Sequence, residues 1–202
     1  MISNRMRIAC LDLEGVLVPE VWQAVARSTG IDELNLTTRD IPDYHQLMTR
    51  RLTILQREGV TLPVIQEVIS SMEPLPGAAD FLDQLRTHIQ VVILSDTFSE
   101  FAKPLMRQLG WPTLLCNSLS TDGSGRVTNY HLRQEQGKLR AVRAFRSLNL
   151  QVFAAGDSYN DLAMILDADS GAFFCPPDSI VTENPTVPVY RDYPSLLEFL
   201  KA

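Results

Sequence analysis

The chain has 202 residues, of which 45% are hydrophobic and 21% charged, with a formal net charge of −6 and a pI near 5.0. This length and composition are typical of one globular domain, or of one domain carrying an insertion, and they exclude collagen, coiled coil and long disorder. The acidic balance argues against a general nucleic-acid binder and against a membrane-surface protein. We find no apolar run of about 18 residues and no signal-peptide pattern, so we expect a cytoplasmic protein.

The three cysteines, Cys10, Cys116 and Cys175, are far apart in the sequence and each lies in an apolar stretch. An odd number at such spacing favours reduced thiols over a disulfide framework. We therefore expect all three to be buried and to pack as small hydrophobic side chains.

Residues 7–13 predict a short buried strand, because an apolar run ends there in acidic side chains. Pro19 then marks the start of a helix, and Gly30 and Gly59 are typical helix stops. A sharp break follows at 73–77, where two prolines and a glycine fall within five residues. The segment between predicts three helices, at 19–29, 43–58 and 63–72, with a polar stretch at 35–42.

After this break, apolar strands alternate with helices. The expected strands lie at 89–94, 113–116, 151–155 and 172–175, and the expected helices at 78–87, 98–109, 135–148, 159–167 and 196–202. A turn at 121–125 is expected to link two short strands. The alternation predicts an α/β fold, a Rossmann-like parallel sheet with helices on both faces. We expect residues 1–18 and 75–202 to form this core, and residues 19–74 to be a small inserted helical cap over the C-terminal ends of the strands.

The first strand ends in Asp12 and Glu14, two carboxylates only two positions apart. Like charges this close are costly unless a cation or a proton is present. The pair fits a nucleophile and a second acid beside a metal ion, although a solvated turn would also account for it.

Polar residues follow two later elements. Ser95, Asp96 and Thr97 come directly after a strand, where a hydroxyl and free backbone N–H groups suit phosphate oxygens. Alternatively, Ser95 or Thr97 caps the next helix. Lys138 opens a predicted helix, where its cation would either reach a phosphoryl group or stay in solvent.

The segment GDSYND, residues 156–161, follows the strand at 151–155. Asp157 and Asp161 offer the hard oxygen ligands that Mg²⁺ prefers. Alternatively, Ser158 caps a helix and Asp161 completes a capping box, and the two roles are compatible. Ligands of open parallel sheets bind outside the C-terminal ends of the strands. These motifs would therefore meet there, and supply acids for a metal and donors for a phosphate.

The four motifs, in this order along the chain, resemble those of the haloacid dehalogenase superfamily of phosphohydrolases: DLEG, SDT, Lys138 and GDSYND. Longer stretches resemble, within it, the phosphoserine phosphatases that also transfer phosphate to homoserine. These stretches are DLEGVLVPE, TTRDIPDY, QVVILSDTF, PLMRQLGWPTLLC and AAGDSYND. The resemblance implies the α/β fold with a helical cap, a Mg²⁺ cofactor and an aspartyl-phosphate intermediate. The implied partners are phosphoserine and, as an alternative acceptor, homoserine, with no nucleic acid and no membrane; a homodimer is compatible with the sequence.

The resemblance also implies roles for the residues of these motifs. Asp12 would be the nucleophile and Glu14 the acid/base. Ser95, the backbone N–H of Asp96 and Lys138 would bind the phosphoryl group.

At the metal, the resemblance places Asp157 together with Asp12 and the backbone carbonyl of Glu14. Asn160 would lie against the substrate, and both Asn160 and Asp161 would support the metal site.

In the cap, the resemblance implies that Glu20 meets the substrate ammonium and Arg51 its carboxylate. Tyr44, Met48 and Arg51 fall on one helix face, and an arginine on a mostly apolar face suits a bidentate carboxylate clamp. Arg51 could instead pack only its stem, with the head group in solvent. A carboxylate such as Glu20 at a helix start is also favourable electrostatically.

The chain departs from the common superfamily pattern at Glu14, where aspartate is usual, and at Val16, where a small hydroxyl residue is common. The extra methylene of Glu14 moves the acid/base by about a bond length, which bears on the acceptor that it activates. Four hypotheses follow: a phosphoserine phosphatase, a phosphotransferase to homoserine, a phosphatase for another small phosphomonoester, and a catalytically silent binding module.

Overall fold

The computed structural model describes residues 5–38, 40–41 and 43–201. Three of the predicted segments reach beyond these residues: the core at 1–4, the polar stretch at Arg39 and Pro42, and the closing helix at Ala202. The described part contains a seven-stranded sheet with the order β4-β3-β2-β1-β5-β6-β7. Its strands are β1 (Arg7–Leu11), β2 (Gln90–Phe98), β3 (Thr113–Thr121), β4 (Val127–His131), β5 (Gln151–Gly156), β6 (Ser170–Phe174) and β7 (Val189–Tyr190).

The sheet is parallel except at one edge, where β3 and β4 form an antiparallel hairpin around the predicted turn. Strand β1 lies near the middle, and its last residue, Leu11, pairs with Ile93 of β2 and Ala155 of β5. The carboxyl ends of these three strands therefore meet at one edge, as the sequence predicts.

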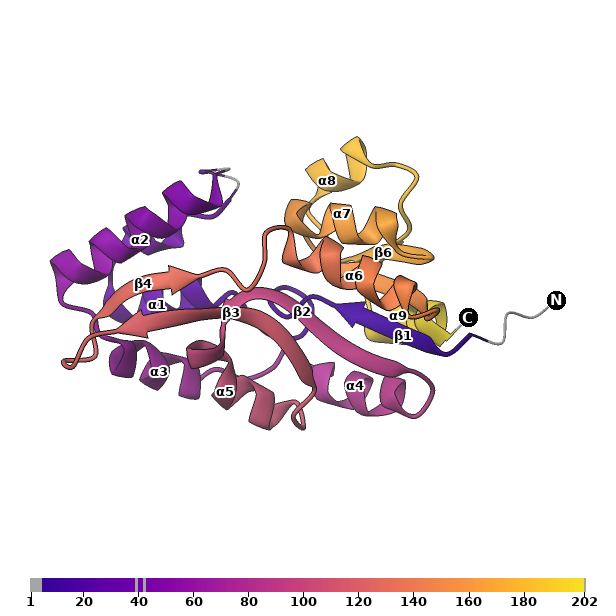
Figure 1. The fold of residues 1–202 in the computed structure, drawn as a ribbon, viewed down its shortest axis with the longest axis horizontal. Helices are drawn as coiled ribbons and strands as arrows, with labels where there is room; N and C mark the ends of the chain where they lie inside the picture. The colour runs from indigo at the N-terminus through magenta and orange to yellow at the C-terminus, as the bar shows by residue number, and fades with distance from the viewer. Residues whose placement is uncertain (1–4, 39, 42, 202) are drawn as a thin grey trace.

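Helices cover both faces of the sheet (Figure 1). Helices α4 (Ala78–Arg86), α5 (Ser99–Gln108) and α9 (Tyr193–Lys201) pack on one face, and α6 (Gly137–Ser147), α7 (Tyr159–Asp167) and α8 (Asp178–Glu183) on the other. Side chains of a strand alternate between faces, so Ala9 and Leu11 of β1 join the first core and Ile8 and Cys10 the second. The predicted α/β fold with helices on both faces is confirmed.

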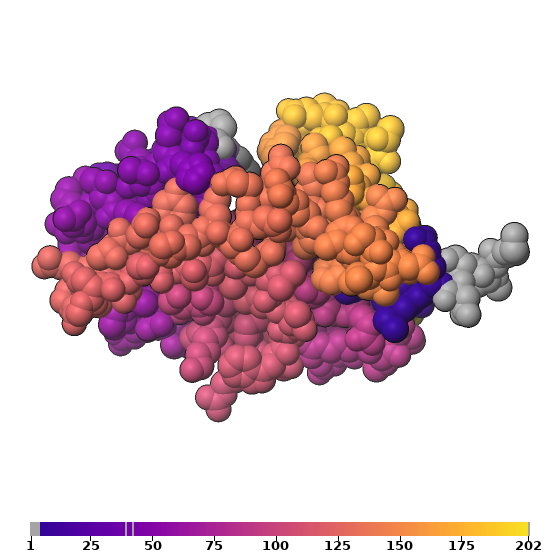
Figure 2. Space-filling view, in the orientation of Figure 1, coloured from indigo at the N-terminus to yellow at the C-terminus, as the bar shows by residue number. Residues whose placement is uncertain are grey.

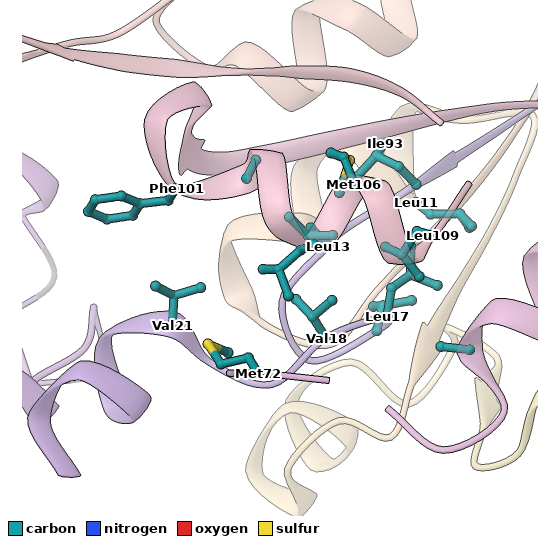
Figure 3. Packing of buried hydrophobic residues seen from close by; sticks show 14 of the residues in the cluster. Leu11, Leu13, Leu17, Val18, Val21, Met72, Ile93, Phe101, Met106 and Leu109 are labelled. Carbon is teal, nitrogen blue, oxygen red and sulfur yellow. The ribbon is translucent and has the colours of Figure 1, made fainter. Parts of the chain in front are cut away.

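The first core continues under the loop that follows β1. Leu13 and Val18 of this loop pack with Ile93 of β2 and with Phe101 and Met106 of α5 (Figure 3). Burying these side chains fixes the loop against the sheet. The polar residues of the loop thereby acquire defined positions.

The C-terminal helix also holds this loop. Tyr193 of α9 is stacked between Phe81 and Phe174, with ring centroids 4.8 and 4.9 Å away. Its hydroxyl donates a hydrogen bond of 2.8 Å to the carbonyl oxygen of Val16. A residue near the end of the chain is thus fixed to the loop near its beginning.

Between β1 and α4 the chain forms α1 (Val21–Thr29), the 3-10 turn η1 (Asp32–Asn35), α2 (Tyr44–Glu58) and α3 (Leu62–Ser70). Helices α1 and α2 end at the predicted glycines, Gly30 and Gly59. Helix α3 lies against α1 and α5, and α2 lies beside β4 (Figure 1). Among the described residues, no helix has the length and apolar character needed to cross a bilayer.

Several boundaries differ from those predicted. Strand β2 continues through an irregular stretch at Ser95–Thr97 to Phe98, which pairs with Asn117 of β3. Strand β3 continues to Thr121 because its second half pairs with β4. The 3-10 turn η1, the short helix α8 and the two-residue strand β7 carry no periodic pattern in the sequence. Strand β7 exists only through its pairing with β6.

The cysteines are all free, as predicted, but only Cys10 is buried. Burial raises the pKa of its thiol to about 12. The prediction that all three are buried is wrong for Cys116, which is half-buried, and for Cys175, which is exposed. Cys175 directly follows the end of β6, where the chain leaves the core, and its thiol donates to the carbonyl of Arg191 at 3.4 Å.

Phe173 offers a test of this packing, because its side chain is fully buried between β6 and the helices of the second core. We expect Phe173→Ala to lower the free energy of unfolding by about 3–5 kcal/mol in urea denaturation. Leu166→Ala is the control, because Leu166 is 63% exposed and its truncation should cost about 0.5 kcal/mol or less. Equal stabilities of the two variants would contradict the arrangement of this core.

Candidate active site

A cavity of about 860 Å³ lies at the edge of the sheet where the strands end. In the space-filling view the molecule is hollowed between α2 and the helices α6 to α8 (Figure 2). The cavity wall contains nine of the ten residues that the sequence analysis singled out for the site: Asp12, Glu14, Glu20, Arg51, Ser95, Asp96, Lys138, Asp157 and Asn160. The tenth, Asp161, is fully buried directly behind the wall.

Asp12 is the first residue after β1 and is almost fully buried. Its backbone N–H continues the sheet pattern by donating to Ala155 at 3.0 Å. One carboxylate oxygen accepts from the N–H of Leu13 at 2.7 Å, and the other lies 2.9 Å from Nζ of Lys138. These contacts hold the carboxylate at the floor of the cavity and exclude the solvated turn that was its alternative.

Lys138 lies in the first turn of α6 and is 95% buried, so it is not a solvated helix residue. Besides Asp12, its ammonium group contacts Asp161 at 2.7 Å and Asp96 at 3.9 Å. Burial opposes its charge, but the surrounding carboxylates outweigh this effect and hold the pKa of Lys138 well above its usual range. The side chain is therefore a permanent cation at the floor of the cavity.

Asp161 has the capping role that the sequence allowed, and it also pairs with Lys138. One oxygen binds Lys138, and the other accepts from the N–H groups of Asp157 at 3.0 Å and Ser158 at 3.1 Å. With Ser158 it forms the predicted capping box of α7. Gly156 makes this close approach possible, because a Cβ there would lie 2.2 Å from Cγ of Asp161.

The carboxylates of Asp12, Asp157 and Asp161 lie within 4.8 Å of one another. Burial is the main cause that raises the pKa of Asp12, and the charge of Asp161 raises it further. One lysine cannot balance three acids, so the negative charge in excess favours a further cation, and hard oxygen donors suit a divalent one. The loop backbone completes this site: Gly15 has φ +76°, and a Cβ there would lie 2.4 Å from Cγ of Asp157.

Glu14 is in a different environment from Asp12. Its carboxylate accepts from the N–H of Val21 at 2.9 Å, at the start of α1. Removal from water raises the pKa of Glu14 to about 7, and the neighbouring charge of Glu20 raises it too, while Arg51 acts in the opposite direction. Near neutral pH this group is therefore able both to give and to take a proton.

Ser95 and Asp96 belong to the end of β2 and do not cap α5. The residue that precedes α5 is Phe98, and Oγ of Ser95 accepts from the N–H of Thr97 at 3.2 Å, so the capping alternative is wrong. The carboxylate of Asp96 accepts from Asn160 at 3.1 Å. Its carbonyl oxygen accepts from the hydroxyl of Tyr44 at 3.2 Å.

Arg51 carries its guanidinium group into the protein, not out to solvent. The residue is 8% exposed, so the alternative in which only its stem packs is wrong. Burial lowers its pKa to about 10, which leaves it charged at neutral pH. Glu20 immediately precedes α1 and lines the same cavity.

Several cavity residues were absent from the predicted site, among them two with aromatic rings on α1 and α2. Trp22 and His45 both line the wall, and Trp22 lies against Arg51. No signal in the sequence identifies them, because they reach the cavity only through the packing of α1 and α2 against the rest of the chain.

Comparisons with known proteins identify the family to which the chain belongs. A family described as haloacid dehalogenase-like hydrolase matches residues 13–166. The chain is 57% identical over 198 residues to phosphoserine phosphatase ThrH of Pseudomonas aeruginosa, covering 98% of this chain and 97% of that protein. It is 56% identical over 198 residues to a phosphoserine phosphatase of Pseudomonas syringae, covering 98% and 84%.

Solved structures share the fold. One, titled a phospho-aspartyl intermediate analogue of phosphoserine phosphatase, has a TM-score of 0.79 at 18% identity and covers 97% of this chain and 99% of its own. An apo form of phosphoserine phosphatase also has a TM-score of 0.79, at 20% identity, and covers 96% and 99%.

The ion pairs of Lys138 can be tested by measuring the free energy of unfolding in the presence of a chelator of divalent metals. We expect Lys138→Met to lower the free energy of unfolding by about 3–5 kcal/mol at pH 8, because it leaves buried acids without their cation. The deficit should shrink at pH 5.5: acids whose folded pKa is raised gain protons as the pH falls, and this removes their repulsion. Lys103→Met, at an exposed position, is the control. A deficit that is the same at both pH values would show that the charges do not interact as described.

Proposed function

The chain belongs to the haloacid dehalogenase-like hydrolase family, and we propose that it converts O-phospho-L-serine and water into L-serine and phosphate. The observation that carries this proposal is the arrangement of Asp12, Lys138 and Glu14 in one cavity: a buried carboxylate, a permanent cation, and an acid with a pKa near 7. The two relatives named as phosphoserine phosphatases, 56% and 57% identical over nearly the whole chain, support the choice of substrate.

We propose that Asp12, Asp157 and the backbone carbonyl of Glu14 hold Mg²⁺, with Asp161 in support. The excess of negative charge at these acids and the hard oxygen donors support this choice. The ion would supply charge neutralisation at the phosphoryl oxygens.

In the first step, a carboxylate oxygen of Asp12 attacks phosphorus in line with the leaving oxygen of serine. The new bond joins Asp12 to phosphorus, and the bond from phosphorus to the serine oxygen breaks. Lys138 faces the negative charge of the transferred group. Glu14 gives its proton to the serine oxygen, so neutral serine hydroxyl leaves.

In the second step, Glu14 is a carboxylate and takes a proton from water. The water oxygen bonds to phosphorus, and the bond to Asp12 breaks. Phosphate leaves, Asp12 is a free carboxylate again, and Glu14 is protonated again. A pKa near 7 suits both directions of this proton transfer.

Polar groups at the strand ends would hold the phosphoryl group. Ser95, the N–H of Asp96 and Asn160 line the cavity around Lys138 and support this role. The contacts of Asp96 with Asn160 and Tyr44 fix the backbone that would present its N–H.

We propose residues 19–74 as the cap that selects the rest of the substrate. Glu20 would receive the ammonium group and Arg51 the carboxylate, which together define an amino acid. Closure over the cavity would also keep out stray water.

A product assay tests the proposal. Purified protein with Mg²⁺ and L-phosphoserine is expected to release phosphate and serine in equal amounts, and Asp12→Asn should release less than a thousandth as much, because an amide is no nucleophile here. No release by the parent protein would overturn the proposed reaction. A second mixture with L-homoserine tests the alternative acceptor: phosphohomoserine as the main product would make the chain a phosphotransferase.

The pKa of Glu14 predicts how activity depends on pH. The first step needs Glu14 protonated, and its folded pKa is about 7, so the competent form dominates below pH 7 and is lost above it. We expect kcat/KM for phosphoserine to fall as pH rises through 7, approaching a tenfold loss per pH unit. Glu14→Gln should remove this limb together with nearly all activity. A flat profile between pH 6 and 9 in the parent protein would contradict the role of Glu14.

A further inference from the structure

Arg51 is buried but uses few of its hydrogen-bond donors. A guanidinium has five N–H groups. Nη2 donates to the carbonyl of Leu36 at 2.8 Å, and Nη1 lies 3.8 Å from the sulfur of Met48. Nε has no hydrogen-bond partner, and within the described residues no carboxylate lies within 4.0 Å of this side chain. The charges of Glu14 and Glu20 favour the cation from beyond 4.0 Å. A buried charge without a counter-ion in direct contact is still costly, so a contacting group must contribute as well.

Trp22 provides that direct contact. The guanidinium carbon of Arg51 lies 4.5 Å from the centroid of the indole ring, a favourable cation–π distance. The ring is itself fixed, because Trp22 is 8% exposed and packs edge-to-face on Phe101 at 5.6 Å. Phe101 in turn packs on Phe98 at 5.3 Å, at the end of β2.

An aromatic partner differs from a carboxylate in one respect that bears on function. An aspartate or glutamate at this position would pair with the N–H groups of Arg51 and consume them. The indole face attracts the positive charge and leaves those N–H groups available. N–H groups of Nε and Nη2, on one edge of the guanidinium, therefore remain available to donate hydrogen bonds to an anionic ligand.

We propose that Trp22 is a positioning residue for substrate selection: its ring holds the guanidinium of Arg51 charged, ordered and unpaired until the carboxylate of the substrate binds it. This inference rests on the proposed function and adds to it the residue through which Arg51 recognises the carboxylate. Removal of the ring should leave Arg51 free to adopt other rotamers, so binding suffers while the chemistry at Asp12 does not.

The test compares two phosphomonoesters in Trp22→Leu and Trp22→Phe. For phosphoserine we expect KM to rise roughly tenfold in Trp22→Leu, with kcat within about twofold of the parent, and a smaller rise in Trp22→Phe, which keeps an aromatic face. For phosphoethanolamine, which lacks the carboxylate, the KM or the inhibition constant should not change. In an Arg51→Ala background, Trp22→Leu should add less than twofold.

The chain offers a matched control and a direct binding readout. It has two tryptophans, and Trp111 is 60% exposed, outside the cavity wall. Trp111→Leu should therefore leave both constants unchanged. It also leaves Trp22 as the one tryptophan, so phosphoserine binding should change the intrinsic fluorescence, and phosphoethanolamine should change it much less.

Two results would overturn the inference: an equal loss for both esters in Trp22→Leu, which would mean general damage to the cap, or an unchanged KM for phosphoserine. Full additivity with Arg51→Ala would overturn it as well. Failure of the proposed function is distinguishable, because the parent protein would then not hydrolyse phosphoserine at all.

Discussion

The ammonium group of Lys138, buried between Asp12 and Asp161, is the interaction on which the rest of the site depends. It neutralises part of a cluster of acids that would otherwise repel one another in a poorly solvated place. Because Asp161 also caps α7, the same ion pair fixes the loop that carries Asp157. Charge balance, helix capping and the orientation of Asp12 thus depend on the same group of contacts.

The two acids of the DLEG motif show how a fold separates chemical roles. Asp12 stays in the line of the sheet and faces the lysine, whereas Glu14 lies where the loop turns toward α1 and faces Glu20 and Arg51. Two positions along the chain are enough to place one carboxylate against a buried lysine and the other where its pKa is near 7. Glu14 is one methylene longer than the aspartate that is usual in the superfamily. The departure from the superfamily pattern therefore affects the carboxylate whose pKa is near 7.

Much of this site is predictable from the sequence, because the motifs sit at strand ends and a parallel sheet brings such ends together. The capping box of Ser158 and Asp161 follows from local pattern, whereas the place of Lys138 in the site follows from the resemblance, because the local pattern also allowed a solvated lysine. The contact between Trp22 and Arg51 does not, since it joins two helices whose relative packing no spacing encodes. The sequence does not predict strand β7 or the exposure of Cys175 for a related reason. Both depend on the neighbouring segments of the fold and not on the local sequence.

The hydrogen bond from Tyr193 to Val16 joins the loop after β1 to a helix that lies 177 residues further along the chain. The position of this loop therefore depends on the packing of α9, although no described residue of α9 lines the cavity. A substitution in α9 that loosens this packing should disturb Glu14 without touching the site itself.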